Sequence, residues 1–206
     1  GSQWVAGRNG GAIAFDGSNH IEVPDDPSIG GDITSSMTIM TWFKSNVELV
    51  ANGAGNRMLE KSNSYFLLQG VANGGMNFLV KDGGSNRTAG IGETLKAGVW
   101  YHITGVVDET EIRVYINGVL KNTVDIGGSV DDAQLPLFIG SDDSGNHFNG
   151  LMDQLLIYNR PVSEAEIKDI IASSEPQGVP VVATDPQSTT IFEGSTLSLQ
   201  VGADGE

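Results

Sequence analysis

The chain reads as a succession of short β-strand segments, and this pattern limits the possible folds more than any other feature. Each segment carries apolar or alternating residues and ends at a cluster of glycine, asparagine, aspartate or serine. Residues 37–44 carry apolar side chains on both faces, which predicts a strand buried on both sides. The spacing is typical of a β-sandwich or jelly roll. The predicted strands are residues 12–15, 20–23, 37–44, 58–61, 65–69, 76–80, 100–107, 111–116, 119–125, 137–139 and 150–158.

Two local signals refine this pattern. Asn117-Gly118 stands between two predicted strands and predicts a two-residue hairpin, because both residue types tolerate positive φ. Ser163 is followed three residues later by Glu166, which forms a capping box and predicts a helix over residues 164–172. We therefore predict an all-β fold, a two-sheet antiparallel jelly-roll sandwich with one short C-terminal helix.

The domain organisation follows from a break in the pattern of strands and helix near residue 174. We predict a main domain over residues 4–173, a linker over 174–180 and a separate segment over 181–206. This last segment, with its Glu193-Gly194 turn and an alternating strand over 196–201, resembles the first strands of an immunoglobulin-like domain. A piece so short cannot bury a core alone, so we expect a multidomain parent chain.

Composition excludes several classes of partner. The formal net charge is −15, which argues against nucleic acid and against anionic membrane surfaces. The acidity fits calcium binding, although it equally serves solubility alone. The absence of cysteine excludes disulfides, cysteine-ligated zinc and thiol catalysis. No stretch approaches the roughly 20 apolar residues of a membrane-spanning helix.

Four stretches together resemble the laminin G-like family of concanavalin A-type sandwiches. They are residues 14–24, residues 37–44, residues 100–104 continuing through 113–119, and residues 139–140 with 148–167. The resemblance implies two stacked antiparallel sheets with a Ca²⁺ ion near one edge. It also implies a place beside polysaccharide-degrading enzymes, whose substrates many bacterial members of the family bind.

The resemblance further implies a structural calcium site held by Asp16 and Asp153, which lie in segments that are neighbours in the family. Gly17, Asn19 and His20 could add carbonyl or amide oxygens, because Ca²⁺ needs about six to eight oxygen ligands. The alternative is that Asp16 forms a turn with its own backbone and that Asp153 accepts hydrogen bonds from buried N–H groups.

Candidate sugar-binding residues flank glycine- and asparagine-rich stretches, whereas Trp42 and Trp100 are expected in the core. Residues 142–147 could form a second calcium site, a sugar-contacting loop or an ordinary hairpin loop. Arg57 and Arg87 suggest an acidic or sulfated glycan, unless they are solvated loop arginines. The predicted set is Arg57, Lys61, Tyr65, Arg87, Asp142, Asn146, His147 and Phe148.

Catalysis is not expected. The hydrolase-type run Glu-x-Asp-x-x-Glu is absent, the acidic residues at 108–111 fall in a predicted turn, and the three histidines are scattered. We therefore predict a non-catalytic carbohydrate-binding module with a structural calcium, in a secreted multidomain polysaccharide-active protein that binds an acidic or marine polysaccharide. The alternatives are an adhesive or spacer module and, less favoured, a polysaccharide-cleaving enzyme. We expect an extracellular monomer of bacterial source, joined to neighbouring domains of its parent chain.

Overall fold

The computed structural model describes residues 3–50, 56–69, 75–142 and 144–174, together with two strands at 181–184 and 202–204. The chain divides into two compact units, Gly1–Ser174 and Glu175–Glu206. In the second unit, β14 (Val181–Thr184) pairs antiparallel with β15 (Gly202–Asp204). The rest of that unit lies outside the described residues, as do most of the predicted linker and the alternating strand predicted over 196–201.

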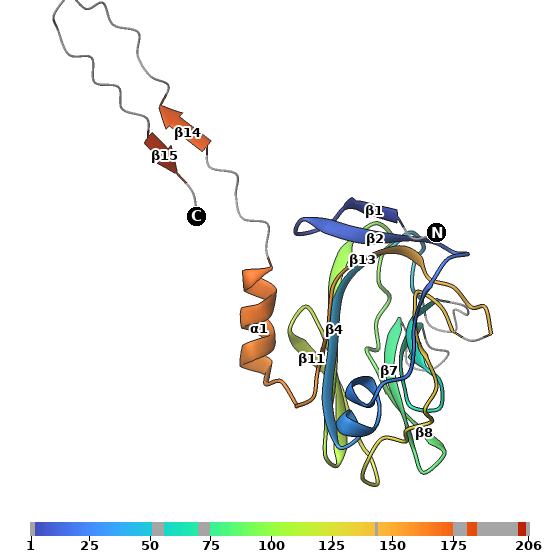
Figure 1. Cartoon of the computed structure of the whole chain (residues 1–206). Helices are drawn as coiled ribbons and strands as arrows, with labels where there is room; N and C mark the ends of the chain where they lie inside the picture. The colour runs from blue at the N-terminus through green and yellow to red at the C-terminus, as the bar shows by residue number, and fades with distance from the viewer. Residues whose placement is uncertain are drawn as a thin grey trace, which may run out of the picture. The chain divides into compact units, whose positions relative to one another are not determined.

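The first unit contains two antiparallel sheets that face each other (Figure 1). The seven-stranded sheet has the order β1-β2-β13-β4-β9-β10-β11. Its strands are β1 (Gln3–Ala6), β2 (Gly11–Asp16), β4 (Ser36–Ser45), β9 (Trp100–Asp108), β10 (Glu111–Ile116), β11 (Val119–Asp125) and β13 (Asn149–Tyr158). The central strand β4 is buried along nearly its whole length, as its two apolar faces predict.

The six-stranded sheet has the order β3-β12-β5-β6-β7-β8. Its strands are β3 (Ile21–Val23), β5 (Arg57–Lys61), β6 (Tyr65–Gln69), β7 (Met76–Asp82), β8 (Ser85–Gly90) and β12 (Leu137–Ile139). Two short 3-10 helices, Pro27–Ile29 and Gly31–Ile33, connect β3 to β4.

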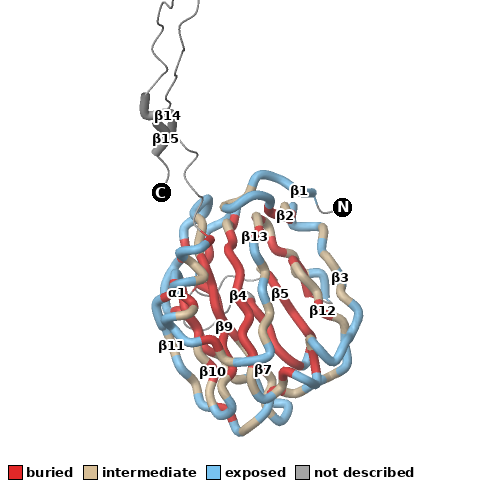
Figure 2. The backbone as a smooth tube through the Cα atoms, turned by 60° about the vertical axis from the view of Figure 1, so that its left-hand side comes forward, coloured by how far each residue is buried: buried red, intermediate tan, exposed pale blue. Residues whose placement is uncertain are grey.

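The main hydrophobic core fills the space between the sheets. Figure 2 shows the buried backbone concentrated in the inner strands of both sheets. Alternate residues of β6 and β7, such as Leu67, Phe78 and Val80, enter this core together with Phe43 and Ile103 from the opposite sheet. The other residues of β6 and β7 therefore point to the outer face of the six-stranded sheet.

Helix α1 (Glu164–Ser173) covers part of the outer face of the seven-stranded sheet (Figure 1). A second apolar cluster forms there, in which Val162 and Ile167 pack with Met40, Val106 and Tyr115. The hydroxyl of Ser163 accepts a hydrogen bond from the Glu166 amide, which confirms the predicted start of the helix.

The predicted jelly-roll sandwich with one short helix is confirmed, and eleven of its strands lie where the sequence predicts them. The hairpin at Asn117-Gly118 has φ values of 49° and 73°, as its turn type requires. The strands β1 and β8 were not predicted, because β1 is only four residues long and exposed throughout, and β8 is mostly polar and ends in glycine.

Candidate functional site

The outer face of the six-stranded sheet carries a row of aligned side chains. Phe66 is in register with Glu60 of β5 on one side and with Leu79 of β7 on the other. Phe138 of β12 is the next partner of Glu60. Residues paired in register point to the same face of a sheet, so two aromatic rings flank the Glu60 carboxylate on this surface.

A groove of about 290 Å³ lies over this row. Its lining combines two cations, one carboxylate, hydroxyl and amide groups, and an apolar pair formed by Phe66 and Leu79. Phe66 retains 8% of its surface exposed, so the groove offers only part of its ring to a ligand. The lining residues are Arg57, Glu60, Ser62, Asn63, Phe66, Leu79, Lys81 and Asn86. We call this feature the sheet groove.

Arg57 joins the sheet groove to the loop that follows β12. Its Nε donates to the Asp142 carboxylate at 3.2 Å and lies 3.7 Å from that of Glu60. Asp142 also accepts hydrogen bonds from the backbone of Ser144 and from Asn146. Desolvation raises the pKa of Asp142, but these hydrogen bonds and the Arg57 charge outweigh it and hold that pKa below its ordinary value. Three predicted residues, Arg57, Asp142 and Asn146, are thus brought together.

Lys81 is the second cation of the sheet groove, and the sequence analysis did not single it out. It pairs in register with Asn86, and both side chains line the groove. Within the described part of the chain, Lys81 makes no ion pair, whereas Arg57 contacts two carboxylates. The groove therefore contains one ammonium whose charge is not balanced by a described carboxylate.

Three predicted sugar-binding residues are buried, and for them the prediction is wrong. Lys61 has no exposed side-chain surface and contacts Asp25 and the Leu135 carbonyl, because it closes the polar end of the core. Tyr65 faces the core, and its hydroxyl donates to the Ile29 carbonyl at 2.7 Å. Phe148 packs between the rings of Phe15 and Phe43.

Arg87 also lies away from the sheet groove. It pairs in register with the core residue Val80, so its side chain starts on the inner face of the sheet. Its Nε donates to Asp82 at 3.0 Å. The neighbouring Asn86 lines the groove instead.

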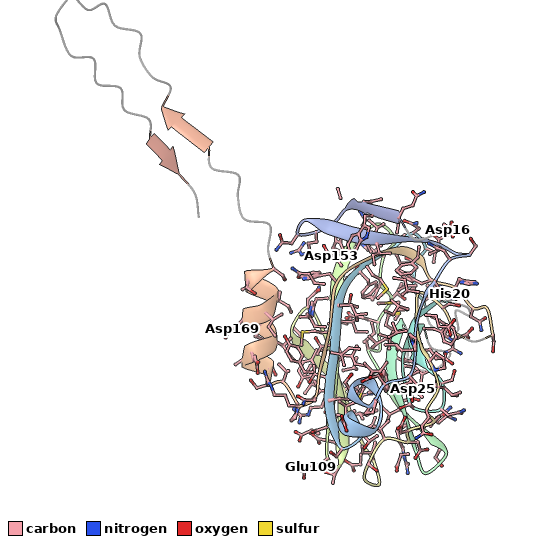
Figure 3. The ribbon with its side chains drawn as sticks, in the orientation of Figure 1. Asp16, His20, Asp25, Glu109, Asp153 and Asp169 are labelled. Carbon is pink, nitrogen blue, oxygen red and sulfur yellow. The ribbon has the colours of Figure 1, made fainter. Side chains whose placement is uncertain are left out.

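The predicted calcium ligands do not converge. Asp16 lies opposite Asn149, while Asp153 lies four residues further along β13, a separation of about 13 Å along the strand. Figure 3 shows the two carboxylates well apart on the same sheet. Asp16 accepts two hydrogen bonds from Ser18, and its amide donates to the Asn19 side chain.

Asp153 is satisfied by its own local partners. Its Oδ2 accepts from the backbone amides of Arg8 and Asn9, at 2.8 and 3.0 Å. Among the described residues, no group of three or more histidines and carboxylates is placed to hold a metal ion. The set Asp16, Gly17, Asn19, His20 and Asp153 does not fit one calcium ion, and both carboxylates make the hydrogen bonds that the alternative expected.

A second surface feature, also missed by the sequence analysis, lies at the edge of the sandwich. Trp4 on the edge strand β1 is 75% exposed and borders an apolar pocket of about 400 Å³. The pocket lies beside a bulge in β13, where Gln154 adopts a φ of 50°. The signal in the sequence was a tryptophan outside the alternating segments, at the first residue of the predicted main domain.

The acidic residues at 108–111 lie at the turn between β9 and β10: Glu109 is in the turn, and Asp108 and Glu111 are the strand residues on either side of it. Asp108 and Glu111 both contact Arg113, and Glu109 stands at the far end of the sandwich (Figure 3). The structure thus pairs two of these carboxylates with an arginine.

Comparison with protein families agrees with this architecture. The model of the concanavalin A-like lectin/glucanases superfamily matches residues 15–168. The chain belongs to this superfamily. The match covers both sheets, from the end of β2 into α1, and includes the sheet groove. No protein of curated function matches the sequence.

Solved structures of similar fold belong to larger proteins. One is domain 4 of the extracellular arabinanase AbnA from Geobacillus stearothermophilus, solved with arabinotriose. It is 20% identical to this chain with a TM-score of 0.69, and the alignment covers 83% of this chain and 81% of that one. The binding domain of Paraclostridial Mosquitocidal Protein 1 is 21% identical with a TM-score of 0.69 over 84% of this chain. That of botulinum neurotoxin DC, solved with rat synaptotagmin II, is 15% identical with a TM-score of 0.64 over 85%. This chain covers only 46% of each toxin chain, and at these identities the likeness shows the fold.

In the described part of the chain, no helix has the length and apolar character needed to span a bilayer.

Proposed function

We propose that this domain is a non-catalytic carbohydrate-binding module that holds an acidic polysaccharide in the sheet groove. The observation that carries the proposal is the ammonium of Lys81, which forms no ion pair with a described carboxylate, beside an apolar platform and amide groups in one groove. We propose further that the parent protein is a secreted, multidomain, polysaccharide-active protein.

Each part of the groove has a role that its chemistry suits. Phe66 and Leu79 offer an apolar surface to the C–H face of a sugar ring. Asn86, Asn63 and Ser62 offer donors and acceptors for hydroxyl groups. Lys81 offers a charge-assisted hydrogen bond to a sugar carboxylate or sulfate. Arg57 is engaged by Asp142 and Glu60, so we assign it to the shape of the groove.

Two further observations support binding over cleavage. Two of the similar structures are binding domains of toxins, and the arabinanase domain was solved with arabinotriose. Within the described residues of the groove, Glu60 is the one carboxylate that lines it, whereas glycoside hydrolysis ordinarily uses a pair. Calcium binding stays a prediction without an assigned site, to be tested by chelation.

The test compares two polymers that share a backbone. Polygalacturonate carries carboxylates, and its fully methyl-esterified form carries none. We expect wild-type protein to bind the acidic polymer more tightly, and Lys81→Gln to weaken that binding about tenfold, corresponding to about 1.4 kcal/mol for one charge-assisted contact. The matched control is Lys168→Gln, on helix α1 over the other sheet.

The outcomes separate the candidate sites. Phe66→Ala should weaken binding of both polymers, because the apolar platform does not depend on ligand charge. If Trp4→Ala abolishes binding while Lys81→Gln and Phe66→Ala leave it unchanged, the ligand lies in the edge pocket and the proposed site is wrong. If neither these nor other glycans bind the folded protein, the adhesive or spacer function takes its place.

A further inference from the structure

Two of the three histidines of the chain, 127 positions apart, meet at one end of the six-stranded sheet. His20 precedes β3, and His147 precedes β13. Their ring centroids lie 6.0 Å apart, with an angle of 30° between the ring planes. His20 also packs edge-on against Phe138, at a centroid distance of 5.6 Å. Phe138 fixes one side of this pair, and Figure 3 shows His20 at the periphery of the domain.

His147 carries an unsatisfied polar atom. Its Nδ1 is buried and has no hydrogen-bond partner among the residues that the structure describes. Buried polar atoms are normally paired, and each exception requires an explanation such as a bound ion or water. A neutral imidazole offers one nitrogen lone pair, and an imidazole lone pair is among the commonest metal ligands in proteins.

The separation of the rings suits a shared ion. A Zn–N bond measures about 2.0–2.1 Å, so two imidazoles bound to one ion place their ring centroids about 5–6 Å apart, depending on the bond angle. The observed 6.0 Å lies at the upper end of this range. The exposed position of His20 gives an ion access from solvent.

The ligand type selects the ion. Imidazole suits zinc, copper and nickel, whereas calcium requires oxygen ligands. No third histidine or carboxylate completes a cluster within the described chain, so water must fill the remaining positions. Such a site is open. It shares His20 with the calcium site that the sequence predicted, but it takes His147 in place of the carboxylates and binds a different ion.

We propose that His20 and His147 form a two-histidine binding site for a divalent transition-metal ion such as Zn²⁺, at the edge of the six-stranded sheet. The proposal is independent of glycan binding, because neither histidine lines the sheet groove. The chain contains no cysteine, so no thiolate competes for the ion.

The test is isothermal titration of tag-free protein with ZnCl₂ at pH 7.5, with CaCl₂ as the comparison ion. We expect one Zn²⁺ per chain and at least a tenfold loss of affinity in both His20→Gln and His147→Gln. The control is His102→Gln, since His102 is the remaining histidine and is buried against Trp42, and this variant should keep the wild-type affinity.

A second measurement guards against indirect effects of the substitutions. Zinc added to the wild-type protein should shift or broaden the NMR signals of two imidazole rings and leave those of His102 unchanged. No binding by wild-type protein, equal binding by His20→Gln and His147→Gln, or perturbation of His102 alone would each overturn the proposal.

Discussion

His102 gives the domain a calculable sensitivity to acid. Its side chain lies on the outer face of the seven-stranded sheet at 2% exposure, with its ring edge-on to Trp42 at 5.2 Å. Its Nδ1 lies 3.3 Å from the Thr104 hydroxyl. Desolvation, and then the nearby charge of Arg8, lower the pKa of His102 from 6.5 to about 4. The folded protein therefore keeps this ring neutral over a range in which the unfolded chain protonates it.

The sign and size of the effect follow from proton linkage. Above pH 6.5 the ring is neutral in both states and contributes no pH dependence. Between pH 6.5 and about 4 the unfolded state binds more protons, so the free energy of unfolding falls as the pH falls. At 1.36 kcal/mol per pH unit this window corresponds to roughly 3 kcal/mol. Below pH 4 both states are protonated and the loss is complete.

Urea unfolding at pH 7.0, 5.5 and 4.0 measures this loss. We expect wild-type protein to lose roughly 3 kcal/mol more between pH 7 and 4 than His102→Gln does, because glutamine does not titrate. Other titrating groups cancel in the difference between the two proteins. His102→Gln will itself be less stable at pH 7, and that offset does not enter the comparison. Equal pH dependence of the two proteins would refute the reasoning.

Two packing predictions concern the interior. Removing the charge of Asp25 takes the nearer carboxylate from the fully buried Lys61 ammonium and leaves Asp132 at 3.9 Å, so Asp25→Asn should cost about 3 kcal/mol in urea unfolding. Lys61→Met should cost less than about 1 kcal/mol, because its carboxylate partners are partly exposed and stay hydrated without the ammonium. A larger loss of stability for Lys61→Met than for Asp25→Asn would contradict this reasoning. A Cβ at Gly105 would lie 2.5 Å from the Phe78 ring, so Gly105→Ala should lower stability by about 1–3 kcal/mol. Phe78→Leu should recover part of that loss in the double variant, and strictly additive losses would show that the two positions do not clash.

Much of the fold could be predicted from the sequence because its signals are local. The strand over 37–44, the Asn117-Gly118 hairpin and the Ser163 cap each depend on neighbouring residues, and each is confirmed. The edge strand β1 could not be predicted in this way. It exists because Trp4 and its neighbours pair with β2, and such pairing leaves no periodic pattern in a strand exposed throughout.

The candidate site was less predictable, because it depends on register and on contacts between distant residues. Arg57 meets Asp142 across 85 positions, and nothing near either residue indicates the pairing. Lys61 and Lys81 both stand on strands, yet one lies in the core and the other lines the groove. A lysine suggests exposure in a sequence, and only the three-dimensional position of Asp25 explains why Lys61 is buried.

Register also separated the predicted calcium ligands. The segments of Asp16 and Asp153 are indeed paired strands, β2 and β13. Their alignment, however, places Asn149 opposite Asp16 and leaves Asp153 four residues away. Adjacency of two strands does not specify which of their residues meet, and a shift of a few positions decides whether two carboxylates can share an ion.

The central claim is that this domain binds glycans, and a glycan array tests it most directly. The folded protein is applied to neutral and acidic polysaccharides in the presence of calcium, and the array is repeated in EDTA with a melting curve recorded under both conditions. We predict retention on acidic polysaccharides that weakens with added salt, because the Lys81 contact is electrostatic. A folded protein that no glycan retains, with or without calcium, would contradict the claim.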